Sequence, residues 1–476
     1  MSRINTNVTS MIATRVLTAQ TNSMNKALQR LSTGLRINSG ADDPAGLIAS
    51  ETLRGQATAL KAAIANGQRA TNVISTAEGA LNEVSSLLSQ LNDAVSSAAN
   101  TSGQSSDEIA AQQLQVDSIL STINRIANST DFGGIKLLNG SLDYTTSGTA
   151  KTSAFDNVIV KSANLVAGAA KTITVQVTTS AQQAKLVGST GVLNGTLTLQ
   201  VAGKNGTQVF SFGTGTTETQ IQNAVKAAKD LTGVSATLSG GRIKFISTEY
   251  GTDGFVTVTR IDDSTAAGAD SNFNKGTVIG TGKGVDAKVT INGQTATANG
   301  LTASINTADL SIEITMNKTL GQKITSTANL AITGGGANFS LSPDVLTGKA
   351  GIGIQSITTG SIGLVTSRLS TLAEGQANNL SSTNLGTSQR TVKEAINQIA
   401  SLRGRLGAFQ KLTIDSTSNS MNVALENTTA AESAIRDADF AAETANMTRS
   451  QILVQAATVV LRQANQAPQN VLSLLQ

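Results

Sequence analysis

Two adjacent carboxylates, Asp42 and Asp43, are the residues that most resemble a catalytic or metal-binding pair. Such a pair needs a base, a cation or further metal ligands close by. The sequence has no His and no Cys, which removes the commonest general base, thiol nucleophiles, disulfides and nearly all zinc sites. Because Pro44 follows Asp43, a helix start is the better interpretation, with Asp as N-cap and Pro at the first helical position.

Two weaker motifs also have ordinary interpretations. Gly334-Gly335-Gly336 lacks the strand, helix and Lys that flank a phosphate-binding loop, so we interpret it as a turn. Asn-x-Ser/Thr sequons begin at Asn194, Asn205, Asn317 and Asn338, but a chain rich in Asn and Thr produces such sequons by chance. We therefore predict no enzymatic activity and no cofactor or metal.

The composition excludes further classes of function. Net charge is +4, from 35 basic and 31 acidic residues in 476, and aromatic residues make up 3%. A nucleic-acid-binding surface needs clustered Lys and Arg, usually with aromatic residues, and no such cluster is present. No apolar run reaches the length of about 18 residues that spans a membrane. Residues 1–7 lack the apolar stretch of a secretory signal, so we expect a cytoplasmic protein or one exported without a cleaved signal.

The first 130 residues have the periodicity of amphipathic helices. Apolar residues recur at steps of three and four until Thr33-Gly34 interrupts them, and Asp43-Pro44 starts a second, longer helix that extends to about Ala98. A third helical stretch runs from Ile109 to Ile126. The first stripe consists of Ile4, Val8, Met11, Met24, Leu28, Leu31 and Leu35, and heptad positions of the second helix include Leu53, Leu60, Ile64, Ile74, Leu81, Leu88 and Leu91.

Residues 390–476 repeat the helical pattern. One seam includes Ile396, Ile399, Leu406 and Phe409, and a second, after Asp437–Phe440, includes Leu453, Ala456, Val460, Val471 and Leu474. Pro468 lies inside the second seam and is expected to kink that helix or leave backbone carbonyls free. Small and amide residues interrupt both seams, so we interpret the two seams as surfaces on which several helices pack.

The middle of the chain alternates with the period of β-strands. Residues 173–177 read as a half-buried strand, and Lys204-Asn205-Gly206 reads as a hairpin turn. A helix is expected from a capping box at Thr217 to a C-cap at Gly233. This order of elements predicts one α+β module near 186–262 and a mostly β module over 263–345.

Two long stretches at opposite ends of the chain resemble bacterial flagellins. Residues 31–47, LSTGLRINSGADDPAGL, resemble the signature of that family, and residues 464–475, ANQAPQNVLSLL, resemble its C-terminus. Met447–Leu453 is similar to the start of the family's last helix. Gly195–Val258 more weakly resembles the insertion modules of flagellins and filament-cap proteins.

The resemblance implies a subunit that polymerises into the extracellular bacterial flagellar filament for motility, after type III export. The expected fold is α+β, with a long antiparallel helical coiled-coil rod formed by both termini and an inserted, mostly β outer domain. Residues 1–43 and 437–476 would form the filament core, 44–185 and 346–436 a helical rod domain with a β-hairpin, and 186–345 the surface insertion. The terminal stripes listed above would be the filament-core interface, and the heptad positions of 53–91 and 396–409 the rod-domain seam.

The implied partners are other copies of the chain, an export chaperone, and the hook-associated junction and cap proteins, with no nucleic acid and no membrane. Many flagellins also present the helix pattern Gln-Arg-x-Arg-Glu-Leu-x-x-Gln to the vertebrate innate receptor for flagellin. The matching stretch begins at Ser89, and Gln90, Asn92 and Asp93 replace its two arginines and its glutamate. A short amide cannot reproduce the charge-assisted contacts of Arg, so we predict weak receptor activation.

Three alternatives remain open. The terminal stripes could form a coiled coil within one chain instead of a polymer interface. The chain could be the hook–filament junction protein, which shares the terminal helical plan, and abundance would distinguish the two. The insertion could add adhesion to a surface or glycan, which deletion of residues 186–345 would test.

Overall fold

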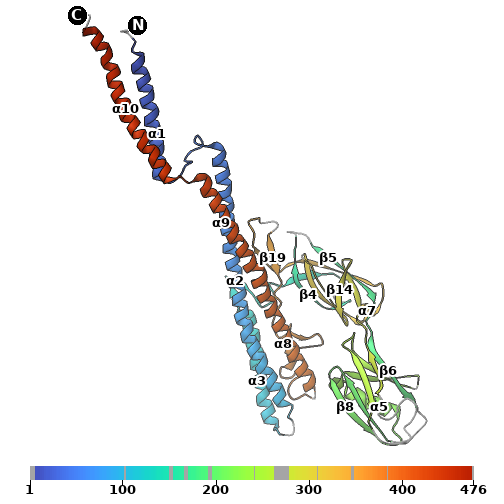
Figure 1. Ribbon diagram of the computed structural model, residues 1–476. Helices are drawn as coiled ribbons and strands as arrows, with labels where there is room; N and C mark the ends of the chain where they lie inside the picture. The colour runs from blue at the N-terminus through green and yellow to red at the C-terminus, as the bar shows by residue number, and fades with distance from the viewer. Residues whose placement is uncertain are drawn as a thin grey trace. The chain divides into compact units, whose positions relative to one another are not determined.

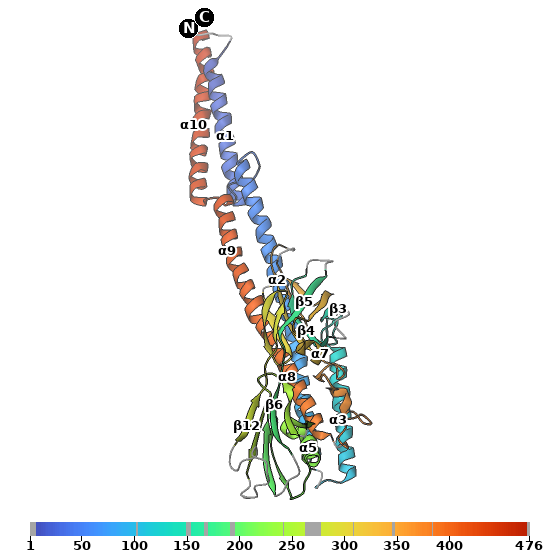
Figure 2. The same cartoon turned by 90° about the vertical axis from the view of Figure 1, so that its right-hand side faces the viewer.

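The computed structural model (Figures 1 and 2) describes residues 6–100, 103–148, 154–165, 170–190, 196–240, 242–261, 278–307, 309–344, 348–382 and 384–473. The chain divides into two compact units. One comprises residues 1–68, 340–348 and 415–476, and the other comprises residues 69–339 and 349–414. The polypeptide is thus α+β, with long helices at both ends and a β-rich middle, as the sequence predicts.

The helices of the first unit begin and end where the sequence predicts. α1 (Val8–Thr33) ends at Gly34, whose φ of 74° is the left-handed conformation of a helix C-cap. α2 (Pro44–Ala98) begins after Asp43, whose Oδ1 accepts a hydrogen bond from the Gly46 N–H at 2.9 Å. The capping interpretation of Asp43 is therefore confirmed.

Two C-terminal helices complete this unit. α9 (Ser416–Arg436) packs against the start of α2, where Met421 joins Leu60 and Ala63 in a buried cluster. α10 (Phe440–Ser473) follows after Asp437. Pro468 does not end α10, which continues to Ser473.

The second unit contains the rest of α2, with α3 (Ser106–Ser129) and α8 (Leu385–Ala408). α3 begins with a capping box, in which Ser105 and Glu108 each bond the other's backbone N–H. It is followed by a two-stranded hairpin, β1 (Asp131–Phe132) and β2 (Ile135–Lys136).

α8 continues into a π-helical segment, residues 409–415. Short β-hairpins and a 3₁₀ turn precede α8: β18 (Ala337–Ser340) with β19 (Lys349–Ile352), β20 (Gly363–Leu364) with β21 (Ser367–Arg368), and η1 (Leu369–Leu372).

Eight antiparallel strands of the second unit form one sheet, in the order β3-β17-β5-β13-β14-β15-β16-β4. Alternate residues of β5, namely Ile173, Val175 and Val177, face the core of this sheet. The short helix α7 (Lys318–Gln322) adds Leu320 to this core. The strands are β3 (Tyr144–Ser147), β4 (Phe155–Ala163), β5 (Lys171–Thr179), β13 (Lys288–Ile291), β14 (Gln294–Asn299), β15 (Thr302–Asn306), β16 (Leu310–Met316) and β17 (Thr327–Gly335).

This sheet crosses the domain boundaries expected from the sequence. From the sequence, residues 44–185 are expected in the rod domain and residues 263–345 in a separate β module. In the structure, β5 pairs with β13 and β17, and β4 pairs with β16, so strands from both sides of the expected boundary share one core. Period-two alternation identifies a strand but not its partner, so the local pattern could not place this boundary.

A second β-rich module spans residues 183–283. It has a three-stranded sheet, β6-β10-β9, and a four-stranded sheet, β12-β11-β7-β8, around one apolar core. The elements are β6 (Gln183–Thr190), β7 (Leu197–Gly203), β8 (Gly206–Phe212), α5 (Glu218–Ala227), α6 (Lys229–Thr232), β9 (Val234–Ser239), β10 (Arg242–Tyr250), β11 (Phe255–Arg260) and β12 (Val278–Lys283).

The predicted hairpin and the capping box at Thr217 are both present in this module. Three details differ from the prediction. The turn is Lys204-Asn205, and Gly206 already belongs to β8. The expected single helix is two, because Ala228 has a non-helical ψ of 13°. β12 lies in the same sheet as β7, so the module continues past residue 262.

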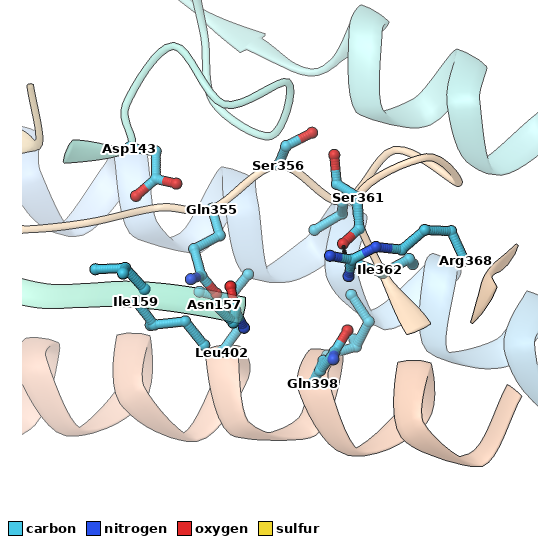
Figure 3. A pocket seen from close by; sticks show the side chains of 13 residues that line it. Asp143, Asn157, Ile159, Gln355, Ser356, Ser361, Ile362, Arg368, Gln398 and Leu402 are labelled. Atoms are coloured by element: carbon cyan, nitrogen blue, oxygen red, sulfur yellow. Dashed lines mark hydrogen bonds between the residues drawn. The ribbon is translucent and has the colours of Figure 1, made fainter. Parts of the chain in front are cut away.

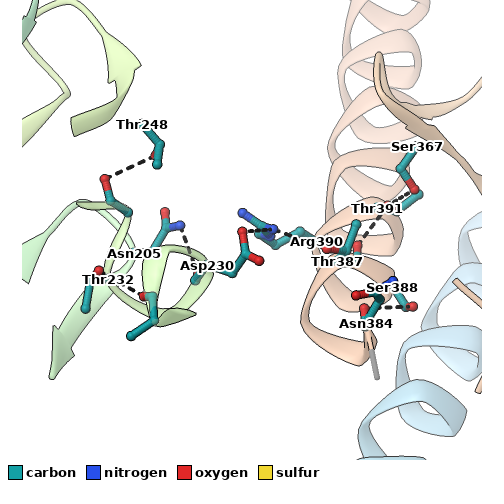
Figure 4. Close-up of polar contacts among 12 residues, drawn as sticks. Asn205, Asp230, Thr232, Thr248, Ser367, Asn384, Thr387, Ser388, Arg390 and Thr391 are labelled. Carbon is teal, nitrogen blue, oxygen red and sulfur yellow. Dashed lines mark hydrogen bonds and ion pairs between the residues drawn. The ribbon is translucent and has the colours of Figure 1, made fainter. Parts of the chain in front are cut away.

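One ion pair joins this module to α8 within the second unit (Figure 4). Arg390 Nη2 lies 3.0 Å from Asp230 Oδ1 of α6, and these side chains are 39% and 52% exposed. An exposed pair of this kind contributes about 0–1 kcal/mol, so it is a weak contact.

Candidate assembly interface

The candidate site of the first unit is the pairing of the two terminal helices. α1 and α10 run antiparallel, and both chain ends lie at the same end of the pair (Figure 1). Near the termini, Asn7 Nδ2 donates to the Ala464 carbonyl at 2.7 Å, and Ser10 Oγ donates to Asn465 Oδ1 at 2.7 Å. At the opposite end, Arg30 Nη1 lies 2.8 Å from Glu443 Oε1.

Small side chains form most of the buried seam between the two helices. Ala13 and Ala27 of α1 are 5% and 3% exposed, and Ala457 of α10 is 7% exposed. Ser450 and Glu443, also on α10, are equally buried. The spacing of 443, 450 and 457 is a strict heptad, so one stripe of α10 faces α1.

Most residues of the apolar stripes predicted from the sequence lie on a different face of the helices from this buried seam. Val8 and Met11 are 55% and 66% exposed, and Val460 is 57% exposed. The exposed members are Val8, Met11, Leu28, Leu453, Ala456 and Val460, whereas Met24, Leu31 and Leu35 are half-buried. Ile4 and Leu474 lie outside the described residues, as does the side chain of Val471. Within one chain, therefore, most of the described members of the predicted stripe are exposed instead of buried in the seam.

Five further exposed apolar residues of these two helices were not predicted. These are Ile12 and Val16 on α1, and Phe440, Ile452 and Val459 on α10. Ile12, Ile452 and Val459 are each adjacent to a predicted residue, and Val16 lies one turn from Ile12, so the signal was present as a wider apolar face. A stripe drawn at strict heptad spacing is too narrow to include them.

The predicted rod-domain seam is largely internal. Leu60, Ile74, Leu81, Leu88, Leu91, Ile399 and Leu406 are buried, and Leu53, Ile64, Ile396 and Phe409 are half-buried. Phe409 packs against Phe339 with ring centroids 6.1 Å apart. These positions form the packing cores of their own units.

The loop between α1 and α2 is held against the segment before α10. The Arg36 N–H donates to the Arg436 carbonyl at 2.7 Å, and the Ala438 N–H donates to the Gly34 carbonyl at 2.9 Å. Asp42 binds within the loop instead of capping a helix, because its Oδ2 accepts from the Ser39 N–H and hydroxyl. The ammonium of Lys26, 2.8 Å away, and the Ser39 bonds hold the pKa of Asp42 well below its usual value.

Comparison with known proteins identifies the family. The family model of the bacterial flagellin N-terminal helical region matches residues 4–143, and that of the C-terminal helical region matches residues 389–475. The chain is 30% identical over 503 residues to the B-type flagellin of Pseudomonas aeruginosa, with 99% of each chain covered. It is 29% identical over 476 residues to flagellin D of Vibrio anguillarum, again with 99% of each covered.

The chain belongs to the bacterial flagellin family. As a flagellin it is a structural subunit of the extracellular flagellar filament, which polymerises with its own copies and serves motility, and it is not an enzyme. Among solved structures, it is similar to the D2-D3 domains of the flagellar cap protein FliD from Serratia marcescens. That similarity has 18% identity and a TM-score of 0.25, and it covers 36% of this chain and 99% of the other.

The residues of this flagellin that align with the innate-receptor pattern lie on α2. Gln90 and Asp93 are exposed, and Asn92 is half-buried, with its Oδ1 buried and unpaired among the described residues. Leu91, between them, is fully buried. The exposed face therefore presents an amide and a carboxylate where the pattern has an arginine and a glutamate.

A polar cavity of about 190 Å³ lies between β4, α8 and residues 355–362 (Figure 3), and the described residues that line it form no reactive constellation. Its Arg368 and Gln398 side chains bond the Gly363 carbonyl, and so serve the fold. Over the described ranges there is no group of three His, Cys, Asp or Glu that could hold a metal, and no helix long and apolar enough to cross a membrane.

Proposed function

We propose that this flagellin joins its neighbours in the filament through the exposed apolar faces of α1 and α10. The supporting observation is that Val8, Met11 and Val460 are more than half exposed although they stand in regular helical stripes. Burial of apolar surface contributes roughly 25 cal/mol per Å². A face of this kind is stabilised when copies of the chain cover it.

The buried seam and the exposed faces have different roles in this proposal. The alanines at 13, 27 and 457 let the two helices approach closely within one chain. The larger residues on the outer faces, including Leu28 and Leu453, then contact neighbouring copies. The terminal helices supply the filament core, and the two β-rich modules form the filament surface.

The other partners in the proposal come from the family. The chain is exported unfolded through the type III apparatus with the help of a chaperone, and it meets the junction and cap proteins at the filament ends. The absence of Cys fits this route, since an unfolded chain in a narrow channel cannot then cross-link. Nucleic acid and membrane have no part in it.

Electron microscopy of filament growth from short seeds tests the proposal. Val460→Asp places a charge on the exposed apolar face and should stop growth, as should deletion of residues 1–36 and 440–476. Gln455→Asp, an exposed position of the same helix, is the matched control and should grow like the unaltered chain. Normal growth of Val460→Asp and Met11→Asp would contradict the proposal.

A further inference from the structure

A buried ion pair lies in the contact between α1 and α10. The Arg30 and Glu443 side chains are 26% and 11% exposed, and their charged atoms are 2.8 Å apart. Arg30 Nε is buried and has no hydrogen-bond partner among the described residues. Removing two charges from water costs free energy that their attraction offsets only in part, so such a pair is poor evidence for stability. A pair that adds little stability can still select one packing arrangement over another.

The apolar part of the seam does little to select an arrangement. Ala13, Ala27 and Ala457 are small. Because the apolar positions of both helices recur at heptad spacing, they face one another again after one helix slides by about seven residues. Such a slide moves one helix by roughly 10 Å along the other, at about 1.5 Å per residue. Packing alone therefore discriminates weakly between registers.

The ion pair does discriminate between them. A slide of one heptad brings Arg30 opposite Ser450 in one direction and beyond Phe440, the first residue of α10, in the other. Ser450 offers no negative charge to a half-buried guanidinium, and the second slide leaves Arg30 without a partner on α10. Only the observed register places Arg30 against Glu443.

We propose that Arg30 and Glu443 are positioning residues, which set the register of α1 against α10 when the chain enters a filament. The inference rests on the proposed function, because the register decides how the exposed residues of the two helices align for neighbouring copies. A wrong register would displace Val8 and Met11 relative to Val460.

Engineered cysteine pairs read the register directly, since the chain has no native Cys. Ser10→Cys with Asn465→Cys reports the observed register, because these side chains touch at 2.7 Å. Ser10→Cys with Thr458→Cys, and Leu17→Cys with Asn465→Cys, report slides of one heptad in each direction. Each pair is grown into filaments from seeds, oxidised, and scored for intramolecular disulfide.

Three backgrounds are compared: the unaltered pair, the apolar double variant R30L/E443L and the charge swap R30E/E443R. We expect at least a tenfold preference for the in-register disulfide in the unaltered and swapped chains. In R30L/E443L the slipped disulfides should rise severalfold although helices and filaments form. An unchanged preference in R30L/E443L, or a slipped register in the swap, overturns the inference.

The remaining outcomes are also decisive. If R30L/E443L does not grow, the single variants R30E and E443R are compared with the charge swap R30E/E443R. Growth of the swap where both single variants fail supports the inference, and failure of the swap overturns it. If the unaltered chain itself does not extend seeds, the proposed function fails instead. Growth of the unaltered chain with register retained in R30L/E443L rejects only the inference.

Discussion

The hydroxyl of Tyr144 holds both backbone groups of Ala163. It accepts from the Ala163 N–H at 3.0 Å and donates to the Ala163 carbonyl at 3.3 Å. Tyr144 lies in β3 and Ala163 in β4, the first and last strands in the order of the eight-stranded sheet. One side chain therefore links the two edges of the sheet, at a place where both residues are buried.

Tyr144→Phe should weaken the sheet by about 1–3 kcal/mol, because it leaves a buried N–H and a buried carbonyl without their partner. The measurement is the urea midpoint of the β-rich unit, together with hydrogen exchange at Ala163. Tyr250→Phe is the matched control, since Tyr250 is half-exposed and its hydroxyl accepts a hydrogen bond from the Gln322 side chain instead of holding two backbone groups. Equal losses in the two variants would contradict a special role for Tyr144.

Gly336→Ala should be more destabilising than its backbone conformation alone explains. Gly336 has a φ of 79°, and a Cβ there would lie 2.6 Å from Cζ of the Tyr144 ring. Gly375, with a φ of 74° and nothing within 4 Å, is the matched control for the backbone strain of about 1–2 kcal/mol. The difference between the two alanine variants in urea unfolding measures the clash, and no difference would show that the ring can move aside.

The sequence predicted local features well and pairings poorly. The Asp43 and Thr217 caps were readable because each depends on residues close in sequence, Pro44 directly after Asp43 and Gln220 three positions after Thr217. The partners of β4 and β5 were not, since they come from distant segments and carry the same alternation as many other strands. For the terminal helices, periodicity identified an apolar face but not that the chain's own seam would be the alanine stripe through Ala13 and Ala457. Burial within one chain and burial in a polymer require the same residue types, so the sequence cannot separate them.

Asp43→Ala should cost about 1 kcal/mol at the start of α2, through loss of its bond to the Gly46 N–H. Hydrogen exchange of the amides at 45–47 should accelerate by roughly a factor of five to ten, since 1.4 kcal/mol corresponds to tenfold. Asp93→Ala, an exposed aspartate in the same helix, is the control and should leave those amides unchanged. Equal acceleration in both variants would reject the capping role.

Activation of the vertebrate innate receptor for flagellin should be weak. Gln90 and Asp93 are exposed on α2 where the recognised pattern has Arg and Glu. A reporter-cell dose series with the purified chain checks this, and Q90R/N92R/D93E should increase the response by restoring charge-assisted contacts. The control is Q90E, which places a negative charge where the pattern has Arg, and it should not increase the response. A strong response from the unaltered chain at low dose would show that other residues provide the contact.

Asp286 should make the junction between the two β-rich modules sensitive to acid. Its carboxylate accepts from the Thr252 N–H at 2.9 Å, the Thr252 hydroxyl at 2.8 Å and the Gly300 N–H at 2.7 Å. Burial alone would raise the pKa of Asp286, but these hydrogen bonds outweigh it and hold the pKa below its usual value.

A carboxylate with a lowered folded-state pKa stabilises the fold above its unfolded pKa, and that contribution is lost as pH falls through the folded value. Hydrogen exchange at Thr252 and Gly300 should therefore rise below about pH 4, near the unfolded pKa of Asp. Asp286→Asn keeps the shape but not the charge, so it should show faster exchange at neutral pH and little further change in acid. Asp156→Asn, in an exposed position of β4, is the control. An acid response that persists in Asp286→Asn would assign the pH sensitivity to another carboxylate.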